Sequence, residues 1–482
     1  LHFANKQNNR ALLNYKKAFS INPDIDYLFG NLLYTKMKLC HWDDFEKDLE
    51  ILVKKINSNE NVITPFALMA LFDDPQIQNI ATKNYANLNF SQSKSFFPIN
   101  PYSNHEKIRI GYFSADFHNH PTMHLMAELF ELHDKNKFEI FAFSFGPDLQ
   151  DDWRKKVSLS FDKFIDVSSK SDTEISTLSR EMEIDIAVNL GGYTQSSRTN
   201  VFANFAAPVQ VNFLGFPGTM GDNYIDYIIA DQTLIPSENQ KYFSEKIVYM
   251  PDSYQVNMSK REVSTKPLSR NDLGLPEEGF IFTCFNSNHK ITPTPFGSWM
   301  RILKTVKGSV LWLYANNEDV ISNILNTASS FGIAENRIIF AKNIPVEDHL
   351  NRISKADLFL DTLPYNAHTT ASDALRMGVP VLTLIGNAFA SRVAASLLNS
   401  VNMPELITTS QDQYESLAIE LALNSEKLDG IKKKLIKNVE TSPLFDSETF
   451  TNNLELAFEE MYRRNKSQLK PDHIVVRDLM GT

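Results

Sequence analysis

Leu358-Phe359-Leu360-Asp361 has the composition of a buried strand, and it is followed by a loop over residues 362–367 and by His368-Thr369-Thr370. A helical run over residues 371–377 begins directly after them. A helix that starts at the end of such a loop directs free backbone N–H groups and side-chain donors at one point. We therefore expect an anion such as a diphosphate to bind there. Ordinary capping of the helix by Thr369 or Thr370 is the alternative that this stretch leaves open.

Short apolar runs that alternate with helical segments extend in both directions from this stretch. The strand-like runs are residues 108–113, 138–145, 184–190, 209–214, 280–285, 310–314, 337–340, 358–361 and 379–384, with a polar interval over about 257–278. This alternation is typical of parallel sheets with crossover helices. We expect an α/β protein with two doubly wound domains, and a ligand in the crevice between them at the carboxyl ends of the strands.

The residues before the first strand are expected to be helical. Residues 11–19, followed by Ile21-Asn22-Pro23, are similar to the second helix of a tetratricopeptide repeat, which Pro23 would end. One copy establishes no period, so a plain helical cap stays open as the alternative. The predicted domains are a helical region over 1–100, Rossmann-like domains over 101–260 and 261–440, and a helical tail over 441–482 that packs back on them.

Composition limits the classes of function. A chain of 482 residues is too long for one core. Its net charge of -10 disfavours a nucleic-acid binder. The two cysteines, Cys40 and Cys284, make neither a disulfide framework nor a zinc site, so a cytoplasmic location is expected. No apolar run or signal-peptide pattern indicates a membrane, and the start at Leu1 leads us to expect missing upstream sequence.

Two further residues are candidates for binding a nucleotide. Lys290 lies just past the strand that ends at Cys284-Phe285, at the end of the strand where ligands bind. A lysine there can neutralise a leaving diphosphate, although a lysine in a loop is more often in solvent. Asp373, one turn after Thr370, is placed to accept a hydrogen bond from a ribose hydroxyl.

In the first α/β domain, His120 stands where the opening strand gives way to a helix. An unperturbed imidazole has a pKa near 6.5, which suits a general base acting on a hydroxyl. His118, His124 and Asp116 are nearby in sequence and leave a metal site open. Their spacing, without a nearby cysteine, makes that alternative weak.

Two loops that carry glycine also follow strands, at residues 189–194 and 214–221. Glycine lets the backbone approach a ligand closely, but such loops are common. The D-x-D triplet that holds Mg²⁺ or Mn²⁺ in many sugar transferases is absent from both α/β halves, since Asp24-Ile25-Asp26 lies in the helical region. We therefore expect no metal and no other cofactor, with Lys290 and the helix start at residue 368 neutralising the leaving group.

Taken together, these segments resemble the O-linked N-acetylglucosamine transferase family in its bacterial form. The resemblance runs from about Ile108 to the C-terminal region, and it is specific because several motifs occur in the right order. The motifs are Ser114-Ala115-Asp116-Phe117 with His120-Pro121, residues 189–194, residues 214–221, Phe285-Asn286 with Lys290, residues 336–340, His368-Thr369-Thr370 with Asp373, residues 390–396, and Ser442-Pro443-Leu444-Phe445.

The resemblance implies a GT-B fold, with two Rossmann-like domains facing across a cleft, and an inverting, metal-independent transfer. N-acetylglucosamine would move from UDP-GlcNAc to Ser or Thr hydroxyls of an acceptor protein. The helical start fits the tetratricopeptide repeats of that family, through which protein partners bind. The residues that match family positions are Lys290 on the diphosphate, His368, Thr369 and Thr370 at the phosphate-binding helix start, Asp373 on the ribose, His349 and Arg352 on the uracil, His120 as the proposed base, and Gly215, Pro217 and Gly218, whose backbone would face the sugar.

Departures from the family pattern bear mainly on the sugar. Tyr365 stands where a cysteine lies near the acetyl group, and a bulky side chain there narrows the space for an N-acetyl group. Asp185 stands where animal members carry a second candidate histidine, and His289, Ser287 and Val346 replace a tyrosine, a glutamine and a lysine. The alternatives are a transferase that uses GDP-fucose or UDP-glucose or modifies asparagine, a UDP-sugar epimerase, and a non-catalytic scaffold built on the helices.

Overall fold

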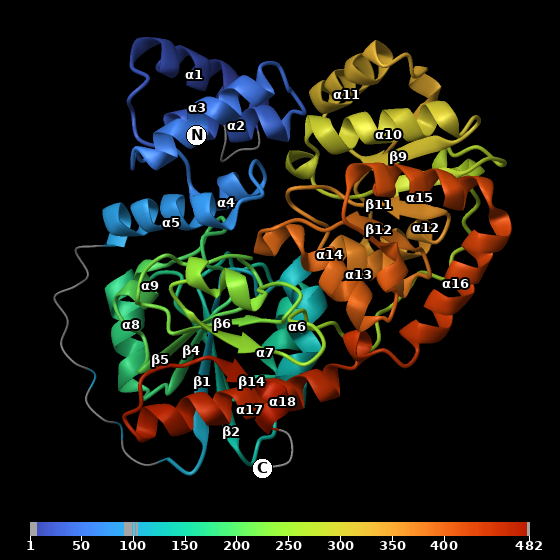
Figure 1. Ribbon diagram of the computed structural model, residues 1–482. Helices are drawn as coiled ribbons and strands as arrows, with labels where there is room; N and C mark the ends of the chain where they lie inside the picture. The colour runs from blue at the N-terminus through green and yellow to red at the C-terminus, as the bar shows by residue number, and fades with distance from the viewer. Residues whose placement is uncertain (1–6, 91–98, 100–101, 103–104, 480–482) are drawn as a thin grey trace. The chain divides into compact units, whose positions relative to one another are not determined.

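The computed structural model describes residues 7–90, 99, 102 and 105–479, and most of its helices and many of its strands are labelled in Figure 1. The chain forms two compact units, which are described separately. The first-sheet unit comprises Thr82–Lys260 and Pro443–Thr482, and the second-sheet unit comprises Leu1–Ala81 and Arg261–Ser442. The helical residues up to Ala81 thus group with the second sheet, and the residues after Ser442 group with the first.

The first-sheet unit is built on eight described parallel strands in the order β14-β7-β6-β5-β4-β1-β2-β3. The strands are β1 (Ile108–Ser114), β2 (Phe138–Ser144), β3 (Lys163–Asp166), β4 (Ile186–Asn189), β5 (Val209–Asn212), β6 (Tyr227–Ala230), β7 (Lys246–Tyr249) and β14 (Ile474–Val475). The helices are α6 (Pro121–Leu132), α7 (Asp152–Ser158), α8 (Asp172–Glu181), α9 (Asn200–Ala203), α17 (Ser447–Lys466) and α18 (Val476–Leu479). The chain order reverses between β1 and β4, which makes their carboxyl ends the expected ligand edge.

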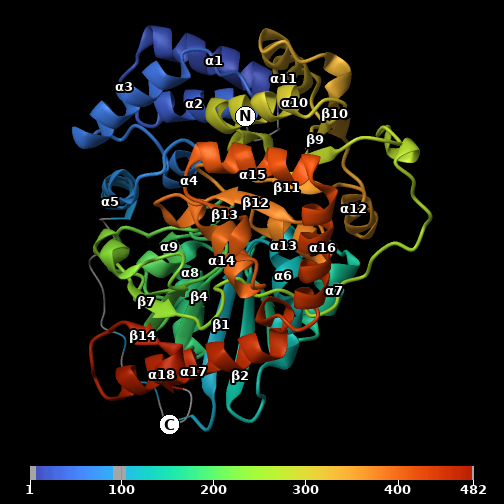
Figure 2. The same ribbon diagram turned by 45° about the vertical axis from the view of Figure 1, so that its right-hand side comes forward.

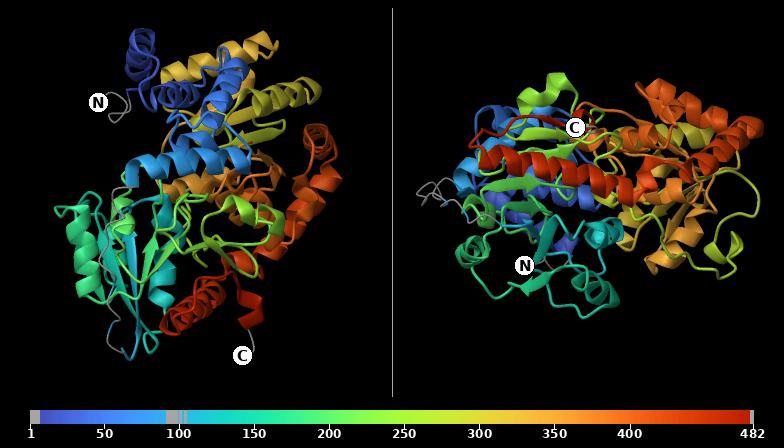
Figure 3. Two further views of the ribbon diagram at one scale, coloured as in Figure 1. Left: turned by 60° about the vertical axis from the view of Figure 1, so that its left-hand side comes forward. Right: turned by 90° about the horizontal axis from the view of Figure 1, so that it is seen from below.

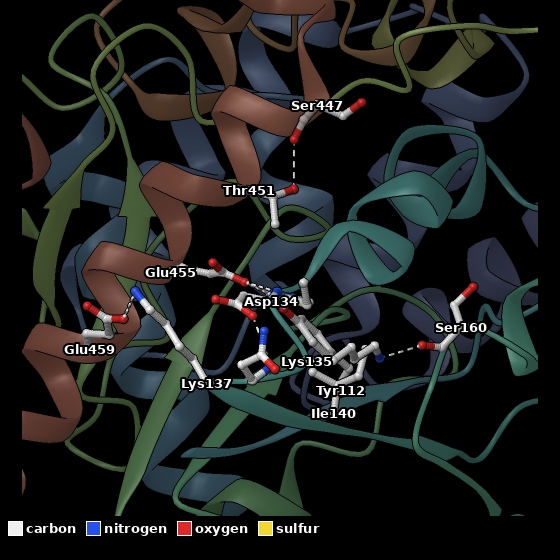
Figure 4. Close-up of polar contacts among 12 residues, drawn as sticks. Tyr112, Asp134, Lys135, Lys137, Ile140, Ser160, Ser447, Thr451, Glu455 and Glu459 are labelled. Carbon is white, nitrogen blue, oxygen red and sulfur yellow. Dashed lines mark hydrogen bonds and ion pairs between the residues drawn. The ribbon is translucent and has the colours of Figure 1, made fainter. Parts of the chain in front are cut away.

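The C-terminal helix α17 belongs to this unit, and Figure 3 shows it in red alongside the first sheet. Glu455 of α17 accepts a hydrogen bond from His133 Nδ1 (2.9 Å) and another from the backbone N–H of Asp134 (2.8 Å). The other ring nitrogen of His133 lies 2.8 Å from the Tyr112 hydroxyl on β1. The side chain of His133 is fully buried, and burial lowers its pKa. This network, shown in part in Figure 4, fixes the tail helix to the sheet.

Replacing Glu455 by alanine is expected to destabilise the first-sheet unit by about 2–4 kcal/mol, because two buried N–H donors would lose their acceptor. The matched control is Glu459→Ala, four residues further along α17. Glu459 pairs with the half-exposed Lys137 at 2.9 Å, and such a pair contributes less than about 1 kcal/mol. Urea unfolding followed by circular dichroism measures both changes. Equal shifts for the two variants would contradict an anchoring role for Glu455.

The second-sheet unit contains a six-stranded parallel sheet in the order β10-β9-β8-β11-β12-β13. The strands are β8 (Ile281–Cys284), β9 (Val310–Tyr314), β10 (Ile338–Ala341), β11 (Leu358–Leu360), β12 (Val381–Leu384) and β13 (Ile407–Thr408). The helices are α10 (Pro293–Thr305), α11 (Glu318–Ser330), α12 (Val346–Ile353), α13 (Thr369–Arg376), α14 (Val393–Ser400), α15 (Gln411–Leu423) and α16 (Ser425–Val439), most of them visible in Figure 2. The chain order reverses between β8 and β11.

The N-terminal helices precede both sheets in the chain. They are α1 (Asn8–Ile21), α2 (Leu28–Lys38), α3 (Phe45–Asn57), α4 (Pro65–Met69) and α5 (Pro75–Phe90). Helix α1 ends two residues before Pro23, and Phe19 stacks on Phe29 of α2 with ring centroids 5.5 Å apart. The prediction of two parallel α/β sheets preceded by helices is confirmed. Among the described helices, none has the length and apolar character that crossing a bilayer requires.

The segment before α5 is tied to the second sheet by one carboxylate. Asp73 accepts hydrogen bonds from the backbone N–H groups of Asn387 (2.9 Å) and Ala388 (2.8 Å), and also from the Ser391 hydroxyl. These residues form the loop that follows β12. Since Ala390 in the same loop accepts a hydrogen bond from the N–H of Asn366 (2.9 Å), Asp73 supports the loop that leads into α13.

Candidate nucleotide site

The candidate site lies at the carboxyl ends of β8 and β11, where the strand order of the second sheet reverses. Asn286, just after β8, connects the two loops. Its amide nitrogen donates to the Thr362 hydroxyl (2.8 Å), and its amide oxygen accepts from the Thr370 hydroxyl. Asp361, just after β11, accepts from the backbone N–H of Ala367 (2.6 Å). Two buried polar residues therefore hold the loop that ends at the start of α13.

Lys290 lies at the end of a short 3₁₀ helix, Asn288–Lys290, and its ammonium group points into this loop. Nζ donates to the carbonyl of Asn366 (2.9 Å) and lies 3.9 Å from the centroid of the Tyr365 ring. Burial lowers the pKa of Lys290 to about 8, although the Asp361 carboxylate opposes that shift. Burial also raises the pKa of Asp361 to about 6. The Lys290 ammonium is therefore a cation that water hydrates only weakly.

Helix α13 begins at Thr369, and His368 occupies its N-cap position. The His368 ring lies 5.0 Å from the Tyr365 ring, between centroids. Burial and the nearby Lys290 ammonium lower the pKa of His368 well below its ordinary value, so the ring is neutral near pH 7. Lys290 and the start of α13 therefore both border Tyr365. A cation and a helix N-terminus meet there, an arrangement that favours an anion.

His349 and Arg352 lie on one face of α12. The guanidinium Nε of Arg352 donates to His349 Nδ1 (3.0 Å), and both side chains lie against the Phe285 ring, with centroid distances of 5.1 and 5.2 Å. Burial lowers the pKa of His349 to about 3, with smaller contributions from Arg352 and Arg261. A neutral His349 whose Nδ1 accepts a hydrogen bond carries its proton on Nε2. It can therefore donate to a carbonyl oxygen of a ligand.

Asp373 forms a buried ion pair with Arg261, and the two side chains are 7% and 5% exposed. Burial raises the pKa of Asp373, while Arg261 and then Arg376 lower it. Arg261 was not among the residues that the sequence singled out. Arg261 lies in the polar interval of the sequence that follows the first sheet. Its neighbours in sequence are those expected around an arginine in solvent. Only the fold brings it to α13.

A cavity of about 350 Å³ also borders Asp361, between the N-terminal helices and helices α10 and α15. Its lining is mainly apolar, with Phe45, Leu71 and Pro364 among the contributing residues, and the described residues that line it include carboxylates but no lysine, arginine or histidine. A diphosphate would meet no cation there. The cavity therefore does not fit the ligand that Lys290 and the start of α13 suit.

His120 lies in the first-sheet unit, at the N-cap of α6. Its Nδ1 accepts from the backbone N–H of Thr122 (3.3 Å) and lies 3.7 Å from the Asp116 carboxylate. Burial lowers the pKa of His120, Asp116 raises it, and His118 lowers it. The ring is therefore neutral near pH 7. Among the described residues, no three His, Cys, Asp or Glu side chains gather in an arrangement that could hold a metal ion.

The glycine loop after β5 is held by polar side chains of the same unit. The amide nitrogen of Asn212 donates to the carbonyls of Phe216 (3.3 Å) and Gly218 (3.4 Å), while Pro217 is buried. A Cβ at Gly215 would lie 2.1 Å from the Leu190 carbonyl oxygen, so this position excludes any side chain. The close approach at Gly215 is therefore to the backbone of Leu190, and the expected approach of this loop to a ligand stays a prediction.

Asp185, one of the departures from the family pattern noted in the sequence, makes a structural contact. Its carboxylate accepts from the backbone N–H of Arg109 (3.0 Å), next to the first sheet, and burial raises its pKa.

Of the residues predicted from sequence, seven from Lys290 to Asp373 share the second-sheet unit with Tyr365. His120 and the loop from Gly215 to Gly218 belong to the first-sheet unit.

A protein-family model that matches most of the chain shows the family to which it belongs. The model of Glycosyl transferase family 41 matches residues 39–263 and 256–454. The chain belongs to this family. The predicted resemblance to O-linked N-acetylglucosamine transferases is thereby confirmed, and the two parallel α/β domains of this family 41 chain are those of the GT-B fold.

Curated relatives and a solved structure support the same assignment for this family 41 chain. A probable UDP-N-acetylglucosamine–peptide N-acetylglucosaminyltransferase, SEC, of Arabidopsis thaliana is 34% identical over 469 residues, covering 92% of this chain and 48% of the relative. A UDP-N-acetylglucosamine–peptide N-acetylglucosaminyltransferase of Caenorhabditis elegans is 26% identical over 483 residues, covering 77% of this chain and 42% of the relative. The chain thus spans about half the length of these relatives or less.

The structure of a mutant O-GlcNAc transferase from Thermobaculum terrenum superposes on this family 41 chain with a TM-score of 0.80. The two sequences are 26% identical, and the match covers 96% of this chain and 88% of the other. The similarity therefore includes the N-terminal helices as well as both sheets.

Proposed function

We propose that this chain carries the catalytic part of a protein glycosyltransferase that moves N-acetylglucosamine from UDP-GlcNAc to Ser or Thr hydroxyls. The observation that carries the proposal is that Lys290 and the start of α13 both border Tyr365. The names of the family 41 relatives, which refer to UDP-N-acetylglucosamine and a peptide, supply the donor and the acceptor class. His349 and Arg352 would hold the uracil, and Asp373 the ribose.

The proposed reaction is a single displacement with inversion. The acceptor hydroxyl oxygen forms a bond to the anomeric carbon while the bond from that carbon to the diphosphate oxygen breaks. UDP departs with the bonding electron pair, and the hydroxyl proton passes to His120 or to a water beside it. The Lys290 ammonium and the free N–H groups of Thr369 and Thr370 stabilise the charge that develops on the diphosphate. In this scheme no metal and no cofactor takes part.

The tautomer of His120 decides whether it can serve as the base. With Nδ1 accepting from the Thr122 N–H, the neutral ring carries its proton on Nε2 and cannot take another there. With Nδ1 protonated and directed at the Asp116 carboxylate, 3.7 Å away, Nε2 is free to accept. The proposal therefore requires the second tautomer during the reaction, in which Asp116 orients the imidazole.

Tyr365 gives a reason to test other donors. Its buried ring lies under the Lys290 ammonium and beside His368, where it takes up space near the diphosphate. A sugar without an N-acetyl group needs less room. UDP-glucose and GDP-fucose are therefore the second candidates for the donor, and the N-terminal helices are the proposed surface for protein partners.

The test is to incubate the purified chain with a Ser/Thr peptide library and UDP-GlcNAc, UDP-glucose or GDP-fucose in separate reactions. Intact-mass spectrometry then identifies the added sugar. Addition of an N-acetylhexosamine, unchanged by EDTA, is the expected result. Addition of another sugar would replace the donor, and loss of transfer with EDTA that returns with Mg²⁺ would overturn the metal-independent scheme. UDP release without peptide modification would indicate hydrolysis rather than protein transfer.

UDP binding is expected to weaken with rising pH, to about one tenth of its neutral affinity at pH 9. The pKa of Lys290 is about 8 in the free protein, so raising the pH removes the ammonium charge that would bind the diphosphate. The terminal phosphate of UDP, whose last pKa is about 6, is already mostly ionised at pH 7, and the little negative charge that it gains up to pH 9 would favour binding rather than weaken it. Isothermal titration calorimetry at several pH values measures the effect. In Lys290→Met the affinity should be lower and independent of pH, and an equally steep profile in that variant would contradict the assignment.

A further inference from the structure

Only one of the two terminal nitrogens of the Arg261 guanidinium takes part in the ion pair with Asp373. Its side chain is 5% exposed, and Nη1 pairs with the Asp373 carboxylate. The second terminal nitrogen, Nη2, is buried and has no hydrogen-bond partner among the described residues. A buried N–H group without an acceptor is costly, more so in a charged guanidinium. The structure therefore holds a buried donor that the acceptor oxygen of a ligand would satisfy.

The surroundings of Arg261 identify the part of the ligand that it would meet. Asp373 lies one turn after the start of α13, and α13 packs on α12, which carries His349. Arg261 is close enough to His349 to contribute to lowering its pKa. The guanidinium thus lies next to both the residue proposed for the ribose and a residue proposed for the uracil.

We propose that Arg261 is a donor-site residue that recognises the ribose of the nucleotide together with Asp373. A ribose hydroxyl is both a donor and an acceptor, and a vicinal diol presents two of them. The Asp373 carboxylate can accept from one hydroxyl while Nη2 of Arg261 donates to the oxygen of its neighbour. The ion pair therefore offers one acceptor and one donor to a diol, which neither residue offers alone. This inference rests on the proposed nucleotide-sugar function.

The test compares the affinity of the purified chain for UDP, 2′-deoxy-UDP and 3′-deoxy-UDP by calorimetry. The wild-type chain is expected to bind UDP about tenfold to a hundredfold more tightly than at least one deoxy analogue. Arg261→Lys keeps a cation for Asp373 but lacks the planar fork. This variant should lose most of the preference for UDP while its melting temperature stays near that of the wild type.

A double variant shows whether Arg261 contacts the ribose directly or only holds Asp373 in place. Arg261→Met with Asp373→Asn removes both charges and leaves no unpaired carboxylate. If Arg261 contacts the ribose, the double variant binds UDP more weakly than Asp373→Asn alone. Equal affinities, or an unchanged UDP preference in Arg261→Lys, would overturn the inference and leave the proposed function standing. A wild-type chain that binds none of the three nucleotides would instead overturn the proposed function.

Discussion

Lys290→Ala is expected to lower the rate of glycosyl transfer by about two to three orders of magnitude. Removing one preorganised donor from the charge that develops in a transition state has costs of this size. Lys290 is suited to that role because its ammonium lies in a buried loop, 3.9 Å from the Tyr365 ring, where water does not screen it. Single-turnover measurement of UDP release and of peptide modification gives the rate of the chemical step.

The same variant removes the hydrogen bond from Nζ to the carbonyl of Asn366, so its folding must be checked separately. Lys290→Met keeps the apolar stem against Tyr365 and should show the same loss of rate with a smaller change in melting temperature. The exposed Lys307 provides the control for a change of net charge, since Lys307→Ala should leave turnover unchanged. Wild-type turnover in Lys290→Met would remove this lysine from the mechanism.

His120→Asn is expected to reduce turnover by about two to four orders of magnitude, the usual contribution of general base catalysis. Asparagine is the appropriate substitution because His120 also caps α6 through its Nδ1. Asparagine is a preferred N-cap residue, whereas alanine would remove the cap and cost about 1 kcal/mol of stability. UDP affinity should stay near the wild-type value, because the proposed nucleotide contacts lie in the second-sheet unit.

The neighbouring histidine provides a matched comparison. His118 lies 5.7 Å from His120, between ring centroids, and its replacement by asparagine should leave most of the activity. In the wild type, turnover should fall at low pH only below the ordinary imidazole range, because burial lowers the pKa of His120. If His120→Asn retains wild-type turnover, then a water or another group takes the proton, and His120 acts only as the N-cap of α6.

Much of the fold could be predicted from the alternation of strands and helices. The runs that define β1, β2, β4, β5 and most strands of the second sheet are apolar and strongly bounded by turn residues. The prediction omitted β3, whose residues Lys163–Asp166 are largely half-exposed or exposed. It also omitted β6 and β7, although both are largely buried, as well as β13 and β14, which are two residues long and carry no periodic signal. Strand pairing between residues so far apart in sequence depends on the whole fold.

The candidate site was predictable where motifs follow strands, and unpredictable elsewhere. Lys290 and His368 lie in the segments that follow β8 and β11, and the topology of a parallel sheet brings these segments to the same edge. Arg261 and Asp373 are distant in sequence, and the buried pair that they form has no local pattern. Asn286 lay within a recognised motif, but its link to Thr370 appears only when both loops are folded.

The return of the chain to the first sheet through α17 and β14 has a consequence for biosynthesis. Strand β7 pairs with β6 on one side, and its other neighbour, β14, leaves the ribosome more than two hundred residues later. At ordinary elongation rates this interval lasts about 10 to 45 s. Throughout it the nascent polypeptide carries an open sheet edge that invites aggregation. The yield of folded protein from a host cell should therefore depend on holdase chaperones and on a low growth temperature more than on the final stability of the protein.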